Sequence, residues 1–359
     1  MTNIDFLVFL PLLISFFATV IATPISLIFL KKFNIVDDPK VHKHPAIIHK
    51  KPIPRGGGIP LFIGVLVASL IFLPLSNIIV TMLIVSFISV VVGVIDDKYD
   101  VSPYIRFLIN IICAVAVVYF GANIPFITNP FGGILFLNHI SIPFLGISSF
   151  TLLSDLIAVV WIVWVMNMLN WSKGVDGQMP GIVAISAIII GILSLRFSHL
   201  DTTSQVAATL SFIVAGASLG FLIFNFYPAK IFPGYGATAI YLMLAVASIL
   251  SSAKLATAIL VMGVPMTDGL FTIARRIWSG KSPFWHDKKH LHHLLLKMGF
   301  GQRKIALFYW TISAILGSLS LVLSSKGKLF AIIMLIILVG GALLFLNYLS
   351  RKAEDETGI

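Results

Sequence analysis

The chain has 359 residues, of which 58% are hydrophobic and only 11% are charged, and its formal net charge is +11. With a mean hydropathy of +1.03, it cannot be an ordinary soluble protein, and an integral membrane protein is predicted. The basic excess predicts a surface that faces lipid headgroups or phosphorylated substrates rather than nucleic acid, because no nucleic-acid-binding module is visible.

Apolar runs of 17 or more residues recur along the whole chain, and each is long enough to cross roughly 30 Å of hydrocarbon as a helix. They predict an all-α fold of about eleven transmembrane helices in a single membrane domain, residues 1–359. No basic region precedes the first run, and it has no small-residue cleavage site, so we expect it to be a retained membrane span rather than a signal peptide. The predicted spans are residues 5–30, 58–75, 77–95, 103–121, 151–169, 179–196, 205–225, 235–252, 255–274, 304–323 and 328–348.

The distribution of basic residues predicts the orientation of these spans. If the N-terminus lies outside, 21 of the 25 Lys and Arg residues fall on the inner side and four fall outside. This asymmetry follows the positive-inside rule and predicts a cytoplasmic C-terminus. A missed or an additional helix would reverse the assignment.

The first inner segment runs from residue 31 to 57 and ends in a Gly-Gly-Gly run at the start of the second span. Glycines beside a helix N-terminus leave backbone N–H groups open to an anion, and Lys50, Lys51 and Arg55 add positive charge. The alternative is a solvated positive-inside loop, which this segment taken alone favours.

Adjacent carboxylates, Asp96 and Asp97, end the third span. Mutual repulsion raises the pKa of one of two neighbouring carboxyls, which suits a base or a metal ligand, but a helix cap is an equal alternative. Arg106 and Asn110 begin the fourth span one helical turn apart, so both can face the same point.

Polar residues also end the fifth and seventh spans. Asn167 and Asn170 lie one turn apart, and the glycines that follow place Asp176 on a tight turn at the inner surface. Asn225 ends the seventh span in the same way. The outer residues 122–150 predict a loop with a short hairpin.

The ninth span contains Asp268, which is either functional or paired with a neighbouring Arg. The inner segment 275–304 follows it and holds eight basic residues and four of the nine histidines, so it must contact water and an anion. A histidine cluster by itself suggests zinc, whereas the oxygen ligands near Asp97 and Asn170 suit magnesium better.

Every polar cluster thus lies on the side that the charge count assigns to the cytoplasm. We expect five inner loops, 31–57, 96–103, 170–178, 226–235 and 275–304, to form one active-site cleft at the bilayer surface. Such a cleft suits a reaction between a water-soluble nucleotide sugar and a lipid phosphate, because neither has to cross the membrane.

One string is specific: Asp287-Lys-Lys-His-Leu-His-His-Leu-Leu, preceded by Gly-Lys-Ser-Pro-Phe and followed by Met-Gly. With it, the chain resembles the polyprenyl-phosphate N-acetylhexosamine-1-phosphate transferases, in the bacterial branch that starts O-antigen, common-antigen or teichoic-acid glycans. The resemblance extends from Lys40 to about Lys304. Supporting matches are Pro54-Arg-Gly-Gly-Gly-Ile59, Asp96-Asp97, Arg106 to Asn110, Asn167-x-x-Asn170, Gly174-Val-Asp-Gly177, Asn225-x-x-Pro-Ala229 and Pro265-x-x-Asp268.

The resemblance implies transfer of a sugar 1-phosphate from a UDP-sugar to undecaprenyl or another polyprenyl phosphate, with release of UMP, in the bacterial cytoplasmic membrane. It implies Mg²⁺ or Mn²⁺ as cofactor and leaves a homodimer open. The implied catalytic residues are Asp96, Asp97 and Arg106, and the implied metal ligands are Asn170 and Asp97. The implied substrate-binding residues are Lys50, Lys51, Arg55, Asn167, Lys173, Asp176, Asn225, Tyr235, His290, His292 and His293.

The chain departs from the family pattern at two positions where relatives carry Asp, namely Lys173 and Tyr235. The second change removes the family's main magnesium-binding carboxylate. Lys173 is therefore expected to neutralise part of the diphosphate charge, with the Tyr235 hydroxyl as a neutral donor. An equal alternative is that Tyr235 only packs at a helix start and that the Lys173 side chain extends to the membrane interface. The alternatives are a binding-only relative that has lost catalysis and, more distantly, a transporter that uses Asp155 and Asp268.

Overall fold

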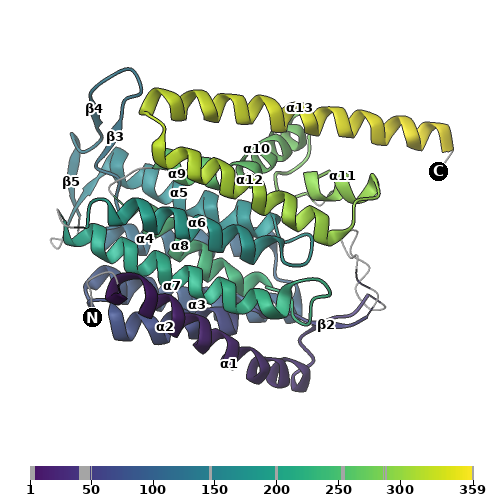
Figure 1. Ribbon diagram of the computed structural model, residues 1–359, viewed down its shortest axis with the longest axis horizontal. Helices are drawn as coiled ribbons and strands as arrows, with labels where there is room; N and C mark the ends of the chain where they lie inside the picture. The colour runs from purple at the N-terminus through teal and green to yellow at the C-terminus, as the bar shows by residue number, and fades with distance from the viewer. Residues whose placement is uncertain are drawn as a thin grey trace.

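A computed structural model describes residues 5–39, 49, 51–144, 148–198, 201–251, 255–285, 287 and 289–357. The helices are η1 (Asp5–Phe9), α1 (Leu10–Lys32), α2 (Gly58–Phe72), α3 (Asn77–Tyr99), α4 (Pro103–Tyr119), α5 (Leu152–Trp171), α6 (Gln178–Leu195), α7 (Thr202–Asn225), η2 (Tyr235–Ala237), α8 (Thr238–Leu250), α9 (Leu255–Val261), α10 (Gly263–Trp278), α11 (Leu291–Lys297), α12 (Gln302–Val322) and α13 (Ser325–Thr357). Most of the longer helices run side by side along one direction (Figure 1).

The helices begin and end where the local sequence requires it. Pro103 occupies the first turn of α4, where its missing N–H costs nothing. Asp201 caps α7, because its carboxylate accepts hydrogen bonds from the backbone N–H groups of Thr203 at 2.8 Å and Ser204 at 3.2 Å. At the end of α3, Asp100 adopts the left-handed conformation that closes a helix.

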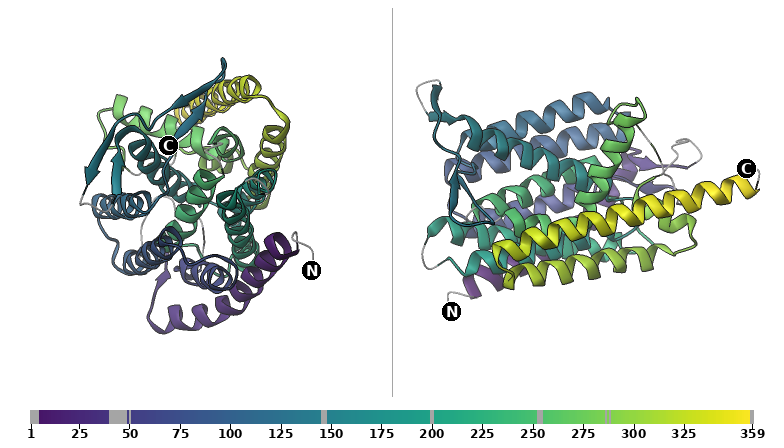
Figure 2. Two further views of the ribbon diagram at one scale, coloured as in Figure 1. Left: turned by 90° about the vertical axis from the view of Figure 1, so that its left-hand side faces the viewer. Right: turned by 90° about the horizontal axis from the view of Figure 1, so that it is seen from above.

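Helix α8 lies inside the bundle (Figure 2). All of its residues from Thr238 to Leu250 are buried, and α3, α5 and α7 pack against it. A helix that is apolar on every side is stable only when other helices surround it. The outer helices instead leave many large apolar side chains exposed, which is the surface expected to face lipid.

Seven described helices are long and apolar enough to cross a membrane, and α9 and α10 pass the same test together as a pair bent by 83°. The all-α, multi-pass membrane class is therefore confirmed. Each remaining predicted run coincides with a shorter apolar helix, Gly58–Phe72, Pro103–Tyr119 or Tyr235–Leu250, none of which reaches 18 residues. The count of eleven spans stays a prediction.

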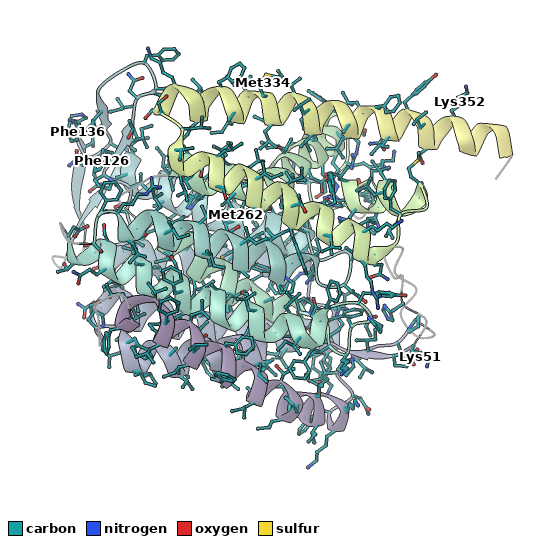
Figure 3. All side chains as sticks on the ribbon, viewed as in Figure 1. Lys51, Phe126, Phe136, Met262, Met334 and Lys352 are labelled. Atoms are coloured by element: carbon teal, nitrogen blue, oxygen red, sulfur yellow. The ribbon has the colours of Figure 1, made fainter. Side chains whose placement is uncertain are left out.

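Where the structure describes it, the segment 122–150, which is predicted to lie outside, contributes to two antiparallel hairpins rather than one. β3 (Phe126–Thr128) pairs with β4 (Ile134–Phe136), and β5 (Ser141–Phe144) pairs with β6 (Ser148–Thr151). They lie at one end of the bundle, and α11 and the strand β2 (Ile53–Pro54) lie at the other (Figure 1). Lys51 is likewise at the opposite end from Phe126 and Phe136 (Figure 3).

Candidate active site

A cavity of about 670 Å³ lies among the segments predicted to be cytoplasmic. This volume lies within the range of small-molecule sites. Lys50 lies outside the described residues, and Lys51 is exposed and is not among the residues that line the cavity. The other predicted site residues all line it: Arg55, Asp96, Asp97, Arg106, Asn167, Asn170, Lys173, Asp176, Asn225, Tyr235, His290, His292 and His293.

Asp96 and Arg106 form an ion pair between the end of α3 and the start of α4. The Arg106 Nη1 donates to both Asp96 carboxylate oxygens, at 3.0 and 2.9 Å, and the Val101 backbone N–H donates to Oδ1 at 3.0 Å. The Asp96 side chain is almost fully buried, with 2% of its surface exposed. The carboxylate therefore fixes the guanidinium at the cavity wall.

Asp97 is held by a different segment, the turn before η2. The Tyr235 backbone N–H donates to its Oδ1 at 3.0 Å, and the Arg55 Nε lies 3.4 Å from the same oxygen. Gly234, which precedes Tyr235, has a φ of +66°, and a Cβ there would overlap the Asp97 Oδ2. Only glycine allows the backbone to approach this carboxylate in that conformation.

The segment that carries Arg55 pairs with the turn before η2. The Phe232 N–H donates to the Pro54 carbonyl at 2.8 Å, and Gly57 and Gly58 donate to the carbonyls of Phe232 at 2.9 Å and Pro233 at 3.0 Å. The expectation that the glycine run leaves its N–H groups open to an anion is therefore wrong for Gly57 and Gly58. Their N–H groups join two segments of the chain instead.

Lys173 follows α5 and lies half-buried beside this turn. Its Nζ donates to the Gly234 carbonyl at 2.9 Å. Burial lowers the pKa of Lys173 to about 8, although the nearby Asp97 carboxylate partly offsets this effect.

Tyr235 connects Arg106 with Asn110, which confirms that these two residues face the same point. The Asn110 Nδ2 donates to the Tyr235 hydroxyl at 3.0 Å, and the hydroxyl itself donates to the Arg106 carbonyl at 3.4 Å. The Arg106 guanidinium also lies 5.1 Å from the centre of the Tyr235 ring. The hydroxyl proton is thus already engaged, and its role as a donor to phosphate stays a prediction.

The tight turn after α5 is held by the last residue of α7 and by the segment that follows it. Asp176 accepts a hydrogen bond from the Ala229 N–H at 3.0 Å, and burial raises its pKa. Asn225 bridges this turn to its own segment, because its Oδ1 accepts from the Gly177 N–H at 3.1 Å and its Nδ2 donates to the Ile231 carbonyl at 2.8 Å. Asp176 and Asn225 therefore shape the cavity wall; their predicted contacts with a nucleotide stay predictions.

The histidines form a cluster around α11. His290 Nδ1 lies 2.9 Å from the Asp268 Oδ2, and the Leu291 N–H donates to the Asp268 Oδ1 at 3.1 Å. Asp268 therefore pairs with a histidine rather than with a neighbouring arginine. The rings of His290 and His292 are parallel at 5.6 Å, and burial lowers the pKa of His292, so this ring is neutral at physiological pH.

Comparison with known proteins agrees with the motifs. The family described as Glycosyl transferase family 4 matches residues 79–252. The "Probable undecaprenyl-phosphate N-acetylglucosaminyl 1-phosphate transferase" of Bacillus subtilis (strain 168) is 32% identical over 339 residues, which cover 90% of this chain and 88% of that protein. The chain belongs to glycosyl transferase family 4.

Two more distant relatives of this family 4 protein have similar names. The "Decaprenyl-phosphate N-acetylglucosaminephosphotransferase" of Mycobacterium leprae (strain TN) is 29% identical, over 85% of this chain and 82% of its own length. The "Undecaprenyl-phosphate alpha-N-acetylglucosaminyl 1-phosphate transferase" of Pasteurella multocida (strain Pm70) is 28% identical, over 94% of this chain and 92% of its own length. The similarity thus extends over most of the chain.

The donor atoms of this family 4 protein do not fit a divalent metal ion in the observed arrangement. Among the described residues, no group of three or more His, Cys, Asp or Glu side chains is placed to hold a metal. The carboxylates of Asp96 and Asp97 accept hydrogen bonds and face Arg106 and Arg55, and Asn170 adds one neutral oxygen, an Oδ1 without a hydrogen-bond partner. A magnesium site at Asn170 and Asp97 stays a prediction that these contacts do not support.

Several residues at the cavity of this family 4 protein were not singled out from the sequence. The Asp287 Oδ2 lies 2.9 Å from the Arg275 Nη2 and 3.3 Å from the Arg276 Nε. Burial alone would raise the pKa of Asp287, but the two guanidinium groups lower it to about 2. The Arg276 guanidinium also lies 5.9 Å from the centre of a ring of Trp171. The signal in the sequence was present, because Asp287 begins the specific histidine string.

Proposed function

We propose that this protein transfers a sugar 1-phosphate from a UDP-sugar to a polyprenyl phosphate and releases UMP. The observation that carries the proposal is the pair of cavity-wall arginines, Arg55 and Arg106, each held by one of two adjacent buried carboxylates. Fixed cations at a cavity suit phosphoryl transfer, which depends mainly on positioning and on charge neutralisation. The family and the names of the relatives support the same reaction.

The proposed reaction joins two phosphates. An oxygen of the lipid phosphate attacks the β-phosphorus of the UDP-sugar, a new P–O bond forms, and the bond from the β-phosphorus to the bridging oxygen breaks. The bridging oxygen leaves with UMP and takes the electron pair. The second pKa of a phosphate monoester is near 6, so at neutral pH the attacking group is mostly a dianion and releases no proton.

Asp96 and Asp97 then act mainly by holding cations rather than by removing a proton. Each carboxylate is buried and faces an arginine, so the arginine is oriented before any substrate arrives. A preoriented guanidinium costs no reorganisation when charge shifts during the reaction. We propose Arg106 and Arg55 as catalytic contacts to the diphosphate, and Asp96 and Asp97 as the residues that position them.

The location of the cavity supports a cytoplasmic reaction in the bacterial inner membrane. The segments that line it contain most of the basic residues, and such residues concentrate on the cytoplasmic side. Both UDP-sugars and the head of a polyprenyl phosphate can reach this surface. An N-acetylhexosamine is the proposed sugar, and the start of a cell-envelope glycan is the proposed use.

The test uses purified protein with undecaprenyl phosphate and a panel of UDP-sugars, UDP-N-acetylglucosamine first, and measures UMP together with the lipid product. We expect both products with at least one donor, and a loss of roughly 100-fold or more in kcat/KM in Arg106→Met, because charge-assisted hydrogen bonds of about 1.5–3 kcal/mol each are removed. Arg196→Met, which removes a guanidinium from the opposite end, is the control. Donor binding without any UMP release would instead identify a binding-only relative.

A further inference from the structure

Lys173 is a half-buried cation in the cavity wall. Its ammonium has three N–H donors, and one of them is used on the Gly234 carbonyl at 2.9 Å. No carboxylate among the described residues forms an ion pair with it. Even partial burial of an ammonium is costly unless surrounding groups or a ligand compensate it, so this position requires an explanation.

One peptide group links Lys173 to Asp97. The carbonyl of Gly234 accepts from the Lys173 Nζ, and the N–H of the same peptide, which belongs to Tyr235, donates to the Asp97 Oδ1 at 3.0 Å. The dipole of this peptide is therefore aligned between a cation and an anion, and each charge strengthens the hydrogen bond of the other. Lys173 and Asp97 are fixed relative to each other although no salt bridge joins them.

Tyr235 holds the ammonium and a guanidinium on one aromatic ring. The Lys173 Nζ lies 5.9 Å from the ring centre and the Arg106 guanidinium lies 5.1 Å from it. Asn110 fixes the ring through the Tyr235 hydroxyl at 3.0 Å. An aromatic ring attracts cations without neutralising them, so two positive charges remain in one small region of the wall.

The charges of this region balance. Arg55, Arg106 and Lys173 face Asp96 and Asp97, and the Asp37 Oδ2 lies 3.8 Å from the Arg55 Nη1. With Asp at both positions 173 and 235, five carboxylates would instead face two arginines. The observed arrangement already has three cations in place for a diphosphate, whereas the exchanged arrangement would attract a divalent cation and repel an anion until that cation is bound.

We propose that Lys173 is the fixed cation of this site, and that the protein binds the diphosphate of its nucleotide-sugar donor through Lys173, Arg55 and Arg106 without a divalent metal ion. The inference rests on the proposed function for the identity of the donor. Tyr235 is assigned a positioning role, since its ring and its backbone N–H place Arg106 and Asp97. Lysine binds phosphate as a point charge and needs no further ligand for this.

Direct binding of UDP to purified protein in lipid nanodiscs tests the inference without turnover. Calorimetric titrations are made in EDTA and in magnesium with the native chain and with Lys173→Met. We expect the native chain to bind UDP equally well in both buffers, and Lys173→Met to bind it about 10- to 100-fold more weakly in both, because one charge-assisted contact is lost. Lys328→Met is the matched control, since Lys328 also hydrogen-bonds through its Nζ, to Thr257 at 2.9 Å, away from the cavity.

The exchanged variant Lys173→Asp with Tyr235→Asp gives an independent readout. We expect the variant to bind Mn²⁺ in an electron paramagnetic resonance titration and to bind UDP only when a divalent cation is present. The native chain should bind no Mn²⁺, and its affinity for UDP should be the same with and without a divalent cation. UDP binding by the native chain that requires magnesium would overturn the inference and leave the proposed function standing. A native chain that binds no UDP in either buffer would contradict both.

Discussion

At the scale of single residues, the half-buried Lys173 is expected to make diphosphate binding depend on pH. Burial lowers its pKa to about 8, well below the ordinary value near 10.5, and the groups that face the ammonium are Asp97, Arg55, Asp96 and Arg106. Because the folded-state pKa is below the unfolded value, the charged lysine destabilises the free protein below pH 8. This cost disappears as the pH rises from about 8 to 10.5. A bound diphosphate would offset it.

The affinity for UDP should therefore decrease as the pH rises through about 8. UDP is already fully ionised at pH 8, so the loss of affinity follows the deprotonation of Lys173. Binding should weaken by up to about tenfold for each further pH unit, until the pH reaches the pKa that Lys173 has in the UDP complex. Titrations from pH 6.5 to 10 measure it. Lys173→Arg should keep the affinity and lose the change near pH 8, because the arginine pKa exceeds 12. A dissociation constant for the native chain that is the same at pH 7 and 9.5 would contradict this assignment.

At the scale of elements, three glycines let η2 lie directly against α2 and α3. A Cβ on Gly58 or on Gly93 would overlap the backbone of Gly236. This close approach brings the Tyr235 N–H to Asp97 at the end of α3. The glycines at this crossing therefore determine the position of the cation group, and Gly58 serves in packing rather than in binding an anion.

Gly93→Ala should disrupt this crossing. The added methyl group has no space beside Gly236, so we expect the free energy of unfolding to fall by about 1–3 kcal/mol and UDP binding to weaken with it. Thermal unfolding in detergent and UDP titration measure the two effects. Gly341→Ala in α13 is the control, because a Cβ there meets nothing within 4 Å and should change stability by no more than about 1 kcal/mol. If Gly93→Ala were as stable as the control, η2 could shift to make room for the methyl group without loss of stability, and the prediction would be wrong.

At the scale of the whole molecule, the two ends differ in chemistry. The basic segments and the cavity lie at the end that includes Lys51, and the hairpins with Phe126 and Phe136 lie at the other (Figure 3). The N- and C-termini also lie at opposite ends of the bundle (Figure 2). By the positive-inside rule, this asymmetry predicts that the cavity faces the cytoplasm.

Cysteine labelling in bacterial spheroplasts tests this orientation. The native chain has one cysteine, Cys113, which is 2% exposed and should not react. A membrane-impermeant maleimide should label Phe131→Cys in intact spheroplasts, because Phe131 is 81% exposed on an outer hairpin loop. Lys51→Cys should react only after the membrane is opened. The opposite pattern would reverse the assigned orientation and place the cavity outside.

Sequence alone determined the class of the protein and the segments that form its site. Hydropathy and charge are properties of local composition, so an all-α membrane protein and five polar inner segments could be predicted without knowing any contact. Motifs such as Asp96-Asp97 and the histidine string then identified many of the residues that line the cavity. The two outer hairpins were only partly predicted, since short strands carry little periodic signal.

Only the tertiary structure decided which groups meet. Asp97 accepts from the N–H of Tyr235, Lys173 donates to the carbonyl of Gly234, and His290 pairs with Asp268. The residues of these pairs are far apart in the chain, and their contacts depend on how closely helices pack at glycines and turns. A sequence pattern records the residue types but not these distances. Whether a carboxylate faces a metal ion, an arginine or a backbone N–H is therefore set by packing, because hydrogen bonds form only at contact distance and electrostatic interactions weaken as the distance grows.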